Sequence, residues 1–404
     1  MCSKALAIVT VTLLLAAGAA ASSVDFLYNF GSQSGDGYYP YAGVIADSKG
    51  NFYGTTYDGG ANSSYGAVYE LSPGKGGYTE TTLYSFNAKP DGYYPYGALA
   101  RDKSGNLYGA TYYGGANGYG RVYELKKSGK IWKETVLYDF AGGTADGYYP
   151  QSQLVFDAKG NLYGTTTYGG AHSGGTVYQL QAQKSGKFKY NLLYSFAGGS
   201  TDGYYPQLGP LFVAKNGYFY GTTLYGGSSY NDGTVYELFN ARGVWVEKVI
   251  YAFTGGKAGQ YPYGGVTMNS KGVIFGATYN GGVSDYGAVY RLTQAKNKTW
   301  AHLTIYSFLG GTNDGAYPYA GLVLDQKGDI WGTTYQGGTS NGGILFELTP
   351  SGKTYKEKVI DIYANSGDGY YPHDTPYLDS KGHLFGTTTS GGTKGGGTVW
   401  EIIP

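Results

Sequence analysis

The chain has 404 residues, with 29 Lys and Arg against 28 Asp and Glu, and a formal net charge of +1 at neutral pH. This balance excludes the strongly basic surface that nucleic-acid binding requires. Tyrosine and glycine are abundant, at 48 and 72 residues, which indicates flat amphipathic rings carried on tight turns. Cys2 is the only cysteine, so we expect the chain to fold without disulfides.

Residues 1–21 have the features of a secretory signal peptide. Lys4 supplies a positive charge, an apolar run extends to about Leu15, and small residues precede a cleavage point before Ser22. We therefore expect a mature domain of residues 22–404 with no membrane span after cleavage. We expect it to be a bacterial protein that is secreted, extracellular or at the cell surface, with the periplasm as an alternative location. The alternative is an uncleaved anchor helix, for which the apolar run is slightly short.

The rest of the chain repeats one unit seven times. Each unit contains a Tyr-Pro pair, and these pairs recur every 54–56 residues. Their prolines are Pro40, Pro95, Pro150, Pro206, Pro262, Pro318 and Pro372. A period this regular indicates a single structural unit that packs against copies of itself.

Four short apolar runs, separated by Gly, Asp, Asn and Ser, make up each unit. In the second copy they are residues 98–102, 106–112, 121–125 and 134–140. Such runs are typical of antiparallel strands joined by turns. The sequence therefore predicts an all-β fold: a seven-bladed β-propeller with four antiparallel strands per blade.

The two ends of the chain each hold part of one unit. Residues 24–30 match the fourth strand of the other copies but precede any first strand, whereas the chain stops at residues 398–402, which form a third strand. We expect the N-terminal strand to join the C-terminal blade and close the ring, which removes two exposed sheet edges.

Turns and glycines recur at fixed places in the unit. An Asp-x-x-Gly-Asn turn, as in residues 102–106, joins the first two strands. The second strand then carries an aromatic-Gly pair such as Tyr108-Gly109. We expect this glycine to let a ring of the neighbouring blade lie against the backbone.

These motifs, DGYYP, GNLYGTT, YGG, GTVYEL and LYSF, resemble the GloVer repeat of the choice-of-anchor tandem-repeat proteins. The resemblance covers residue 24 to the C-terminus. It implies a secreted or surface location and no established reaction.

In a propeller, the loops that follow the second and fourth strands emerge on one face, and here both are rich in tyrosine. The tyrosine before each proline is identical in all copies, which suits a packing role: Tyr39, Tyr94, Tyr149, Tyr205, Tyr261, Tyr317 and Tyr371. The residue after the proline varies and opens the strand nearest the axis: Tyr41, Tyr96, Gln151, Gln207, Tyr263, Tyr319 and His373. We expect this second set to line the channel mouth and bind a ligand.

The position before the invariant tyrosine also varies, and it supplies a secondary set of candidate ligand-binding residues. These are Tyr38, Tyr93, Tyr148, Tyr204 and Tyr370, with Gln260 and Ala316 in the other two copies. The alternative for both sets is that they only cover loops.

Six copies place an aspartate before the tyrosines, at Asp36, Asp91, Asp146, Asp202, Asp314 and Asp368, whereas the fifth has Ala258. We interpret these residues as turn formers, because each loop offers one carboxylate and calcium needs six to eight nearby oxygens. The sequence shows no zinc spacing, catalytic triad or cofactor fingerprint, so we predict no metal, no cofactor and no assigned catalytic residue.

Two functions from different classes remain open. The first is a monomeric, non-enzymatic module that binds an extracellular glycan or surface protein through its tyrosines. The second is an enzyme acting on extracellular polysaccharide through acids such as Asp36, Asp91, Asp368 and Asp374, although only Asp374, beside His373, breaks the symmetry of the repeat. A structural or adhesive protein without a small ligand is the third possibility.

Overall fold

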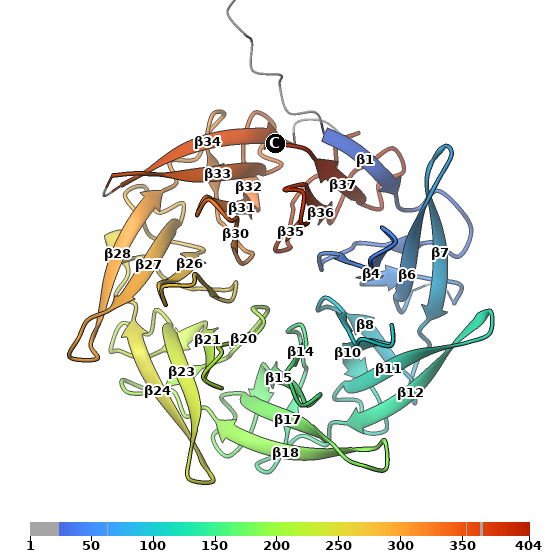
Figure 1. Ribbon diagram of the computed structural model, residues 1–404, viewed down its shortest axis with the longest axis horizontal. Coiled ribbons are helices and arrows are strands. Elements are labelled where there is room, and N and C mark those ends of the chain that lie inside the picture. The colour runs from blue at the N-terminus through green and yellow to red at the C-terminus, as the bar shows by residue number, and fades with distance from the viewer. Residues whose placement is uncertain (1–23, 63, 353, 364–366) are drawn as a thin grey trace, which may run out of the picture.

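Seven antiparallel sheets stand around a central axis like the blades of a propeller, and each contains the four strands of one blade (Figure 1). This computed structural model describes residues 24–62, 64–352, 354–363 and 367–404. The predicted fold, with seven blades of four strands, is confirmed. Residues 1–21, interpreted as a signal peptide, lie outside the described residues.

The strands of each blade follow one another from the axis to the rim, and the blades are numbered along the chain. Blade 1 consists of β3 (Ile45–Ala46), β4 (Phe52–Thr56), β6 (Ala67–Gly74) and β7 (Gly77–Ser85). Blade 2 consists of β9 (Ala100–Arg101), β10 (Leu107–Gly114), β11 (Arg121–Ser128) and β12 (Ile131–Asp139). Blade 3 consists of β14 (Val155–Phe156), β15 (Leu162–Thr166), β17 (Thr176–Ala182) and β18 (Phe188–Ser195). Blade 4 consists of β20 (Phe212–Val213), β21 (Phe219–Thr223), β23 (Thr234–Ala241) and β24 (Val244–Ala252).

The remaining blades have the same order. Blade 5 consists of β25 (Thr267–Met268), β26 (Ile274–Thr278), β27 (Ala288–Gln294) and β28 (Trp300–Ser307). Blade 6 consists of β30 (Val323–Leu324), β31 (Ile330–Thr334), β33 (Ile344–Ser351) and β34 (Thr354–Ile362). Blade 7 is β35 (Tyr377–Leu378), β36 (Leu384–Thr388), β37 (Thr398–Ile402) and β1 (Val24–Asn29). A 3-10 turn, η1 (Gly256–Ala258), precedes blade 5, and no helix among the described residues is long and apolar enough to cross a membrane.

Strand lengths differ from the prediction in a regular way. The innermost strand of blade 2 pairs over only Ala100–Arg101, and the residues just before it, Tyr96 to Ala98, line the central opening. The outer pair is longer than predicted, since β11 and β12 continue pairing past the buried core to a hairpin at Ser128 and Ile131. Hydrophobic patterning therefore located the strands but not the ends of their hydrogen-bonded ladders.

The N-terminal strand closes the ring, as predicted. β1 pairs antiparallel with β37, from Val24 opposite Ile402 to Asn29 opposite Thr398. Figure 1 shows these two segments, from opposite ends of the sequence, side by side in one blade. Phe30, which follows β1, is fully buried and packs its ring on Tyr69 of blade 1, 5.0 Å away. The N-terminal segment thus completes blade 7 through β1 and packs blade 7 against blade 1 through Phe30.

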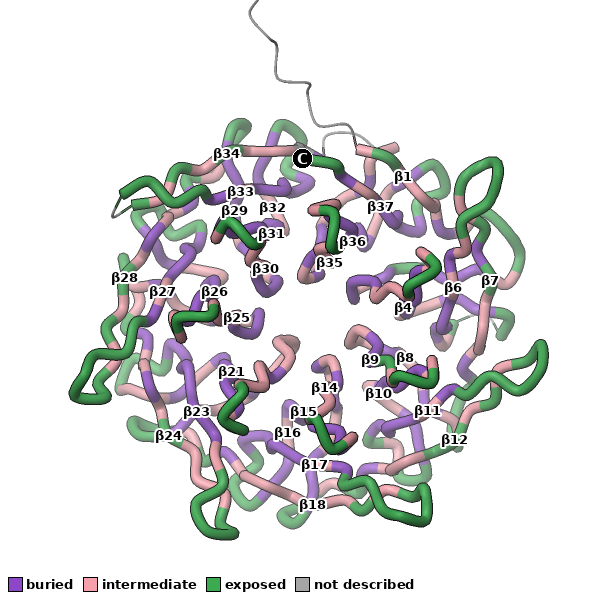
Figure 2. The backbone as a smooth tube through the Cα atoms, viewed as in Figure 1, coloured by how far each residue is buried: buried purple, intermediate pink, exposed green. Residues whose placement is uncertain are grey.

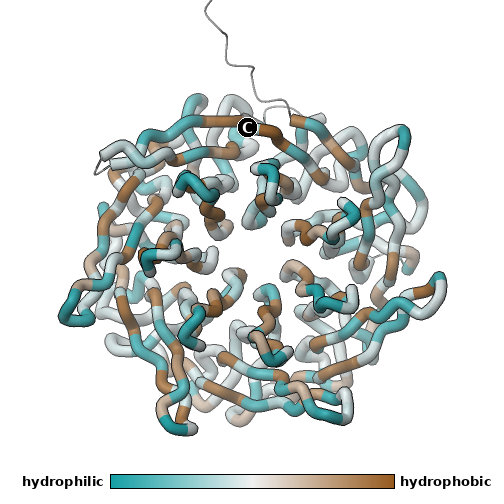
Figure 3. Tube along the Cα trace, in the orientation of Figure 1, coloured by the Kyte–Doolittle hydropathy of each residue, from teal (hydrophilic) through white to brown (hydrophobic). Residues whose placement is uncertain are grey.

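The core is divided into seven layers, one between each pair of neighbouring blades. Between blades 1 and 2, for example, Tyr53 and Val68 pack with Leu107 and Tyr123. Figures 2 and 3 show that the inner strands are buried and often apolar, whereas the exposed, polar positions concentrate in loops and hairpin ends. Because each blade is apolar on both faces, each needs a neighbour on both sides.

The repeated glycine of the second strand was expected to receive a ring from the next blade, and this expectation is wrong. Gly54 instead faces Tyr69, which lies opposite it on β6 of the same blade. A Cβ at Gly54 would clash with the Tyr69 ring. The glycine therefore lets the large third-strand aromatic lie flat across its own sheet, where it forms part of the packing surface.

Acidic side chains are partly buried beside the loops that enter the blades. In blade 4, Glu247 of β24 lies near Asp202, which belongs to the loop entering that blade. Burial, and after it the neighbouring Asp202 carboxyl, raises the pKa of Glu247 to about 8. Glu80 and Glu357 occupy the same place beside Asp36 and Asp314, and burial raises the pKa of each to about 7.

The seam can be tested by deletion. Removing residues 22–30 should expose the edge of β37 and uncover Phe30's partner, so we expect a lower Tm, a broader unfolding transition and aggregation. Removing only Ile403 and Pro404, which follow the last strand, is the matched control and should leave the transition unchanged. Equal melting curves for the two truncations would contradict closure by β1.

The buried acids make stability depend on pH. Because the folded state holds the Glu247 proton more tightly than the unfolded chain does, stability should be greatest below about pH 4.5 and fall as the pH rises to about 8. Glu247→Gln should reduce this pH-dependent loss of stability by roughly 1–3 kcal/mol, a range that allows for screening by water near the partly exposed carboxyl group. Urea unfolding at pH 5 and pH 9 measures the difference, and parallel pH profiles for both proteins would refute it.

Candidate functional site

The loops after the second and fourth strands lie on one face, where they pair with each other. Short ribbons join them in four blades: β2 (Gly37–Tyr38) with β5 (Asp58–Gly59), β13 (Gly147–Tyr148) with β16 (Tyr168–Gly169), β19 (Gly203–Tyr204) with β22 (Tyr225–Gly226), and β29 (Gly315–Ala316) with β32 (Gln336–Gly337). In blade 2 the segment β8 (Gly92–Pro95) pairs directly with β10. The predicted sharing of a face is therefore confirmed.

The seven invariant tyrosines clamp each blade to the one before it. Each has a left-handed backbone, with φ between 58° and 62°. The Tyr94 N–H donates to the carbonyl of Tyr65 in blade 1, at 2.9 Å, and the other copies make the same link to the preceding blade. The Tyr94 ring also stacks on Tyr57 of blade 1, with centroids 4.4 Å apart. The predicted packing role is thus carried by backbone and ring together.

The repeated aspartates hold the loops that lead to these tyrosines. Asp146, which is buried, accepts hydrogen bonds from the Tyr138 hydroxyl at 2.9 Å and from the N–H groups of Ala141 and Gly147, both at 2.7 Å. Asp36, Asp91, Asp202 and Asp314 accept corresponding bonds. Their interpretation as turn formers is confirmed for these five loops.

A cavity of about 200 Å³ lies at the axis where the innermost strands begin. Five of the seven candidate residues line it: Tyr41, Tyr96, Gln151, Tyr319 and His373. Gln207 and Tyr263 do not line it, although Tyr263 stacks on Tyr319 with centroids 4.4 Å apart. Blades 1, 2, 3, 6 and 7 therefore each contribute one of the candidates to a shared opening.

The aromatic members form a continuous arc around part of the opening. Tyr96 stacks on Tyr41 at 4.8 Å with nearly parallel rings, and Tyr41 meets His373 edge to face at 5.0 Å. His373 in turn contacts Tyr319 at 4.0 Å, and Tyr319 stacks on Tyr263. Such contacts fix ring orientation as well as burying apolar surface. The arc is thus a rigid wall rather than a set of independent surface rings.

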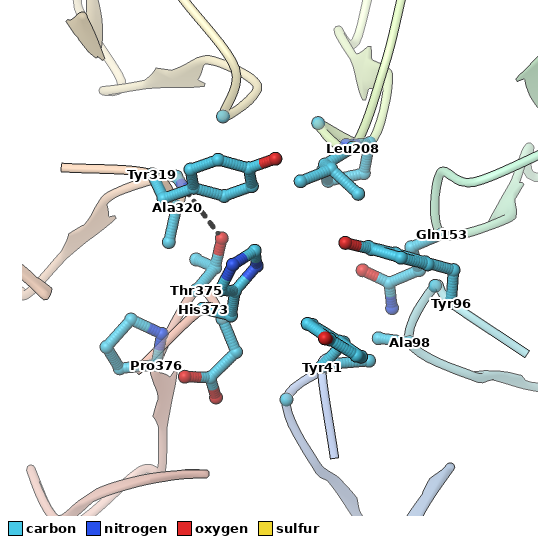
Figure 4. Close-up of a pocket in the computed structure, with 18 of the residues that line it drawn as sticks. Tyr41, Tyr96, Ala98, Gln153, Leu208, Tyr319, Ala320, His373, Thr375 and Pro376 are labelled. Carbon is cyan, nitrogen blue, oxygen red and sulfur yellow. Dashed lines mark hydrogen bonds between the residues drawn. The ribbon is translucent and has the colours of Figure 1, made fainter. Parts of the chain in front are cut away.

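The polar ends of the wall point inward. Figure 4 shows the hydroxyl groups of Tyr96 and Tyr319 directed into the opening, with Leu208 on the far side. Burial, followed by the influence of neighbouring tyrosines, raises the pKa of both hydroxyl groups well above the usual value of 10. Both therefore stay neutral at physiological pH and can donate and accept hydrogen bonds.

Several lining residues were missed by comparing a single position among the copies. Leu208 projects into the opening, Gln153 lies beside Tyr96, and Thr375 accepts a 2.9 Å hydrogen bond from the Gly321 N–H (Figure 4). Gln153 donates to the Leu99 carbonyl at 2.9 Å. The signal was available one or two residues further along each copy, where the repeat is equally variable.

His373 and Asp374 introduce the only ionisable pair of adjacent residues among those that line the cavity in the described part of the chain. Burial lowers the pKa of His373 to about 3 and raises that of Asp374 to about 7. His373 is therefore neutral at physiological pH, whereas the Asp374 carboxyl group titrates near neutrality.

The secondary candidates lie in the loop ribbons and not in the cavity lining. Tyr38 pairs with Asp58, Tyr93 with Tyr113, Tyr148 with Tyr168, Tyr204 with Tyr225, and Tyr370 with Ser390. Tyr38, at 38% exposure, borders a second cavity of about 400 Å³ with Tyr39 and Asp58. The structure does not bring this set together around one opening.

No group of three or more His, Cys, Asp or Glu residues within the described ranges is placed to hold a metal ion. The other histidines are dispersed. His302 stacks on Tyr251 between blades, at 4.3 Å, and His383 contacts Glu401 at 2.9 Å in blade 7. They do not contribute to the channel mouth.

The left-handed backbone of the invariant tyrosines should change how alanine and glycine substitutions rank in their effect on stability. Tyr94→Ala should lower the free energy of unfolding by roughly 2–3 kcal/mol, because the stack on Tyr57 is lost. Tyr94→Gly should cost no more than Tyr94→Ala, since glycine adopts a positive φ freely. At the neighbouring Tyr93, whose φ is not positive, the glycine variant should be less stable than the alanine variant. Chemical denaturation of the four variants tests this, and the same order at both positions would contradict it.

Comparison with known proteins supports the repeat and the fold. A profile of the Gloeobacter/Verrucomicrobia repeat matches residues 15–236 and 209–404. No curated protein matches the sequence.

Similar solved structures share the architecture at low sequence identity. The extracellular domain of a protein described as a one-component system from B. thetaiotaomicron superposes with a TM-score of 0.55 and 10% identity, covering 93% of this chain and 39% of that longer chain. A protein described as a 6-phosphogluconolactonase from Bacteroides fragilis gives 0.51 and 13%, covering 87% and 85% of the two chains.

The resemblance expected from the DGYYP and YGG motifs is therefore confirmed by a match that spans nearly the whole propeller. The chain belongs to the Gloeobacter/Verrucomicrobia repeat family.

Proposed function

We propose that this protein is a non-enzymatic binding module that receives a carbohydrate at its channel mouth. One observation carries the proposal: residues that vary among the copies converge on a single cavity, whereas the invariant tyrosines and repeated aspartates hold the ring together. A repeat whose variable positions meet at one opening has the layout of a recognition site on a constant scaffold.

The chemistry of the cavity suits a sugar. Neutral hydroxyl groups of Tyr96 and Tyr319, and the amides of Gln151 and Gln153, can exchange hydrogen bonds with sugar hydroxyl groups. The aromatic rings and Leu208 supply apolar surface for C–H groups. A volume of about 200 Å³ matches a terminal sugar unit rather than a long chain segment.

The acids weigh against the enzymatic alternative. Glycoside hydrolysis usually needs two carboxyl groups about 5–10 Å apart on either side of the bond that breaks. Asp36 and Asp91 are engaged in the loop clamps, and Asp374 is the only carboxyl residue that lines the cavity in the described part of the chain. A purely structural or adhesive repeat would leave the cavity and its ordered wall without a role.

We place the protein outside the cytoplasm, as a monomer. The support is the signal-peptide pattern of residues 1–21, and one protein of similar fold is an extracellular domain. An extracellular glycan or a glycosylated surface protein is then the expected partner.

A glycan array probed with the mature chain tests the proposal. We expect retention of a defined set of glycans without release of shortened products. Tyr96→Phe and Tyr319→Phe keep the ring stacks and remove one hydroxyl group each, so each should weaken binding about two- to tenfold. Tyr230→Phe is the matched control, because Tyr230 is 67% exposed and lies outside the cavity.

The outcomes separate the three functions. Product release would establish an enzyme, and absence of binding to every glycan would favour a structural role. Binding that responds equally to all three tyrosine variants would place the site elsewhere on the surface.

A further inference from the structure

The turns between the first and second strands of the blades each carry a lysine, on the face opposite the channel mouth. In blade 1 this turn joins β3 to β4, and Figures 2 and 3 show the corresponding turns as exposed, hydrophilic segments around the axis. All seven lysines are exposed: Lys49, Lys103, Lys159, Lys215, Lys271, Lys327 and Lys381. Each blade therefore contributes one exposed cation to a ring on this face.

The acids of these turns are directed into the turns themselves. In blade 1 the Asp47 Oδ1 atom accepts the N–H groups of Lys49 and Asn51, at 2.8 and 3.0 Å, and Oδ2 accepts the Asn51 amide at 3.0 Å. The Asp47 side chain is half-buried, so it offsets part of the charge from beneath the exposed lysine. Within the described ranges, none of the seven lysines forms an ion pair.

The hairpins between the third and fourth strands emerge on the same face and add further cations. Their exposed basic residues are Lys75, Lys126, Lys127, Lys130, Lys184, Lys187, Arg242, Lys296 and Lys298. Where the structure describes these turns and hairpins, none of their exposed residues is Asp or Glu. We call this surface the lysine face. The even charge balance of the whole chain hides it, and excluding a strongly basic surface from that balance is wrong for this face.

Two of these hairpins also expose an apolar side chain beside a basic one. Ile131 and Val244, at 68% and 66% exposure, are the first residues of β12 and β24. Ile131 follows Lys130, and Val244 lies two residues after Arg242. Apolar side chains next to basic ones suit a membrane interface, where the cations meet headgroups and the apolar groups reach the acyl boundary.

We propose that the lysine face binds the surface of a membrane that contains anionic lipids, with the channel mouth directed away from it. Each lysine near such a surface adds a modest attraction, so binding requires many lysines at once. A ring of cations on one face of the propeller can meet many headgroups of an extended surface together, whereas a single polymer chain would reach few of them. This inference does not depend on what the channel mouth binds.

Co-sedimentation with lipid vesicles tests the proposal. The full mature chain is mixed with vesicles of phosphatidylcholine that contain about 30% phosphatidylglycerol, or with vesicles of phosphatidylcholine alone. We expect binding to the anionic vesicles and none to the neutral ones. Raising the NaCl concentration from about 50 to about 300 mM should weaken binding at least fivefold, because salt screens the attraction.

Two triple variants with the same change in net charge locate the binding face. The first combines Lys49→Glu, Lys159→Glu and Lys271→Glu on the lysine face. The matched control combines Lys89→Glu, Lys257→Glu and Lys394→Glu, which are exposed residues in loops of the channel-mouth face. We expect the first variant to lower the vesicle partition coefficient at least tenfold and the control to lower it no more than twofold.

A double variant, Ile131→Ser with Val244→Ser, separates a membrane from a soluble anionic polymer. It should weaken binding to the anionic vesicles at least twofold and leave binding to dextran sulfate unchanged, because only the membrane offers an acyl boundary. Dextran sulfate bound as tightly as the vesicles, with neither interaction altered by this variant, would identify a polymer as the partner and overturn the proposal.

The other outcomes also decide the matter. Equal binding of the wild-type chain to both kinds of vesicle, or to neither, overturns the proposal, and this comparison needs no variant. Equal losses in the two triple variants show that only the total charge matters, which overturns the assignment to the lysine face. Loss confined to the lysine-face variant, with a circular dichroism spectrum like that of the wild type, supports it.

Discussion

The structure depends on the packing of sheets that are apolar on both faces. A single blade cannot cover its own surfaces, so the chain is stable only when every blade has two neighbours. That requirement forces the ring to close, and it closes because β1 pairs with β37 as the fourth strand of blade 7. The clamps between blades follow from the same need, because the invariant tyrosines and their backbone bonds hold each interface in register. The central opening is what remains after seven such interfaces have been formed.

Much of this architecture could be read from the sequence. The period of the Tyr-Pro pairs determined the number of blades, and alternating apolar runs located the strands. Strand ends were less accurate, because β11 and β12 continue to pair beyond the point where hydrophobic residues stop. The partner of Gly54 was assigned to the wrong blade, since a sequence pattern does not distinguish a ring across the same sheet from one across an interface.

The site was predictable to a lesser degree. Comparing copies separated the scaffold tyrosines from the variable residues, and five of the seven variable positions do line one cavity. Tyr263 stands behind Tyr319, an arrangement that depends on exact blade geometry. The positive φ of Tyr94 and its equivalents carries no signal in their residue type, because tyrosine is not a usual left-handed residue. Burial of Asp374 is likewise a property of the interface and not of its own strand.

The seam between β1 and β37 also determines how the ring responds to mechanical force. Val24 lies opposite Ile402, so both outer ends of the pair are at the same end of the ladder. A pull applied to the two ends in opposite directions would load one hydrogen-bonded pair at a time and peel the strands apart. The hydrogen bonds of this seam therefore do not share such a load, as they would if the strands were pulled past each other along their length.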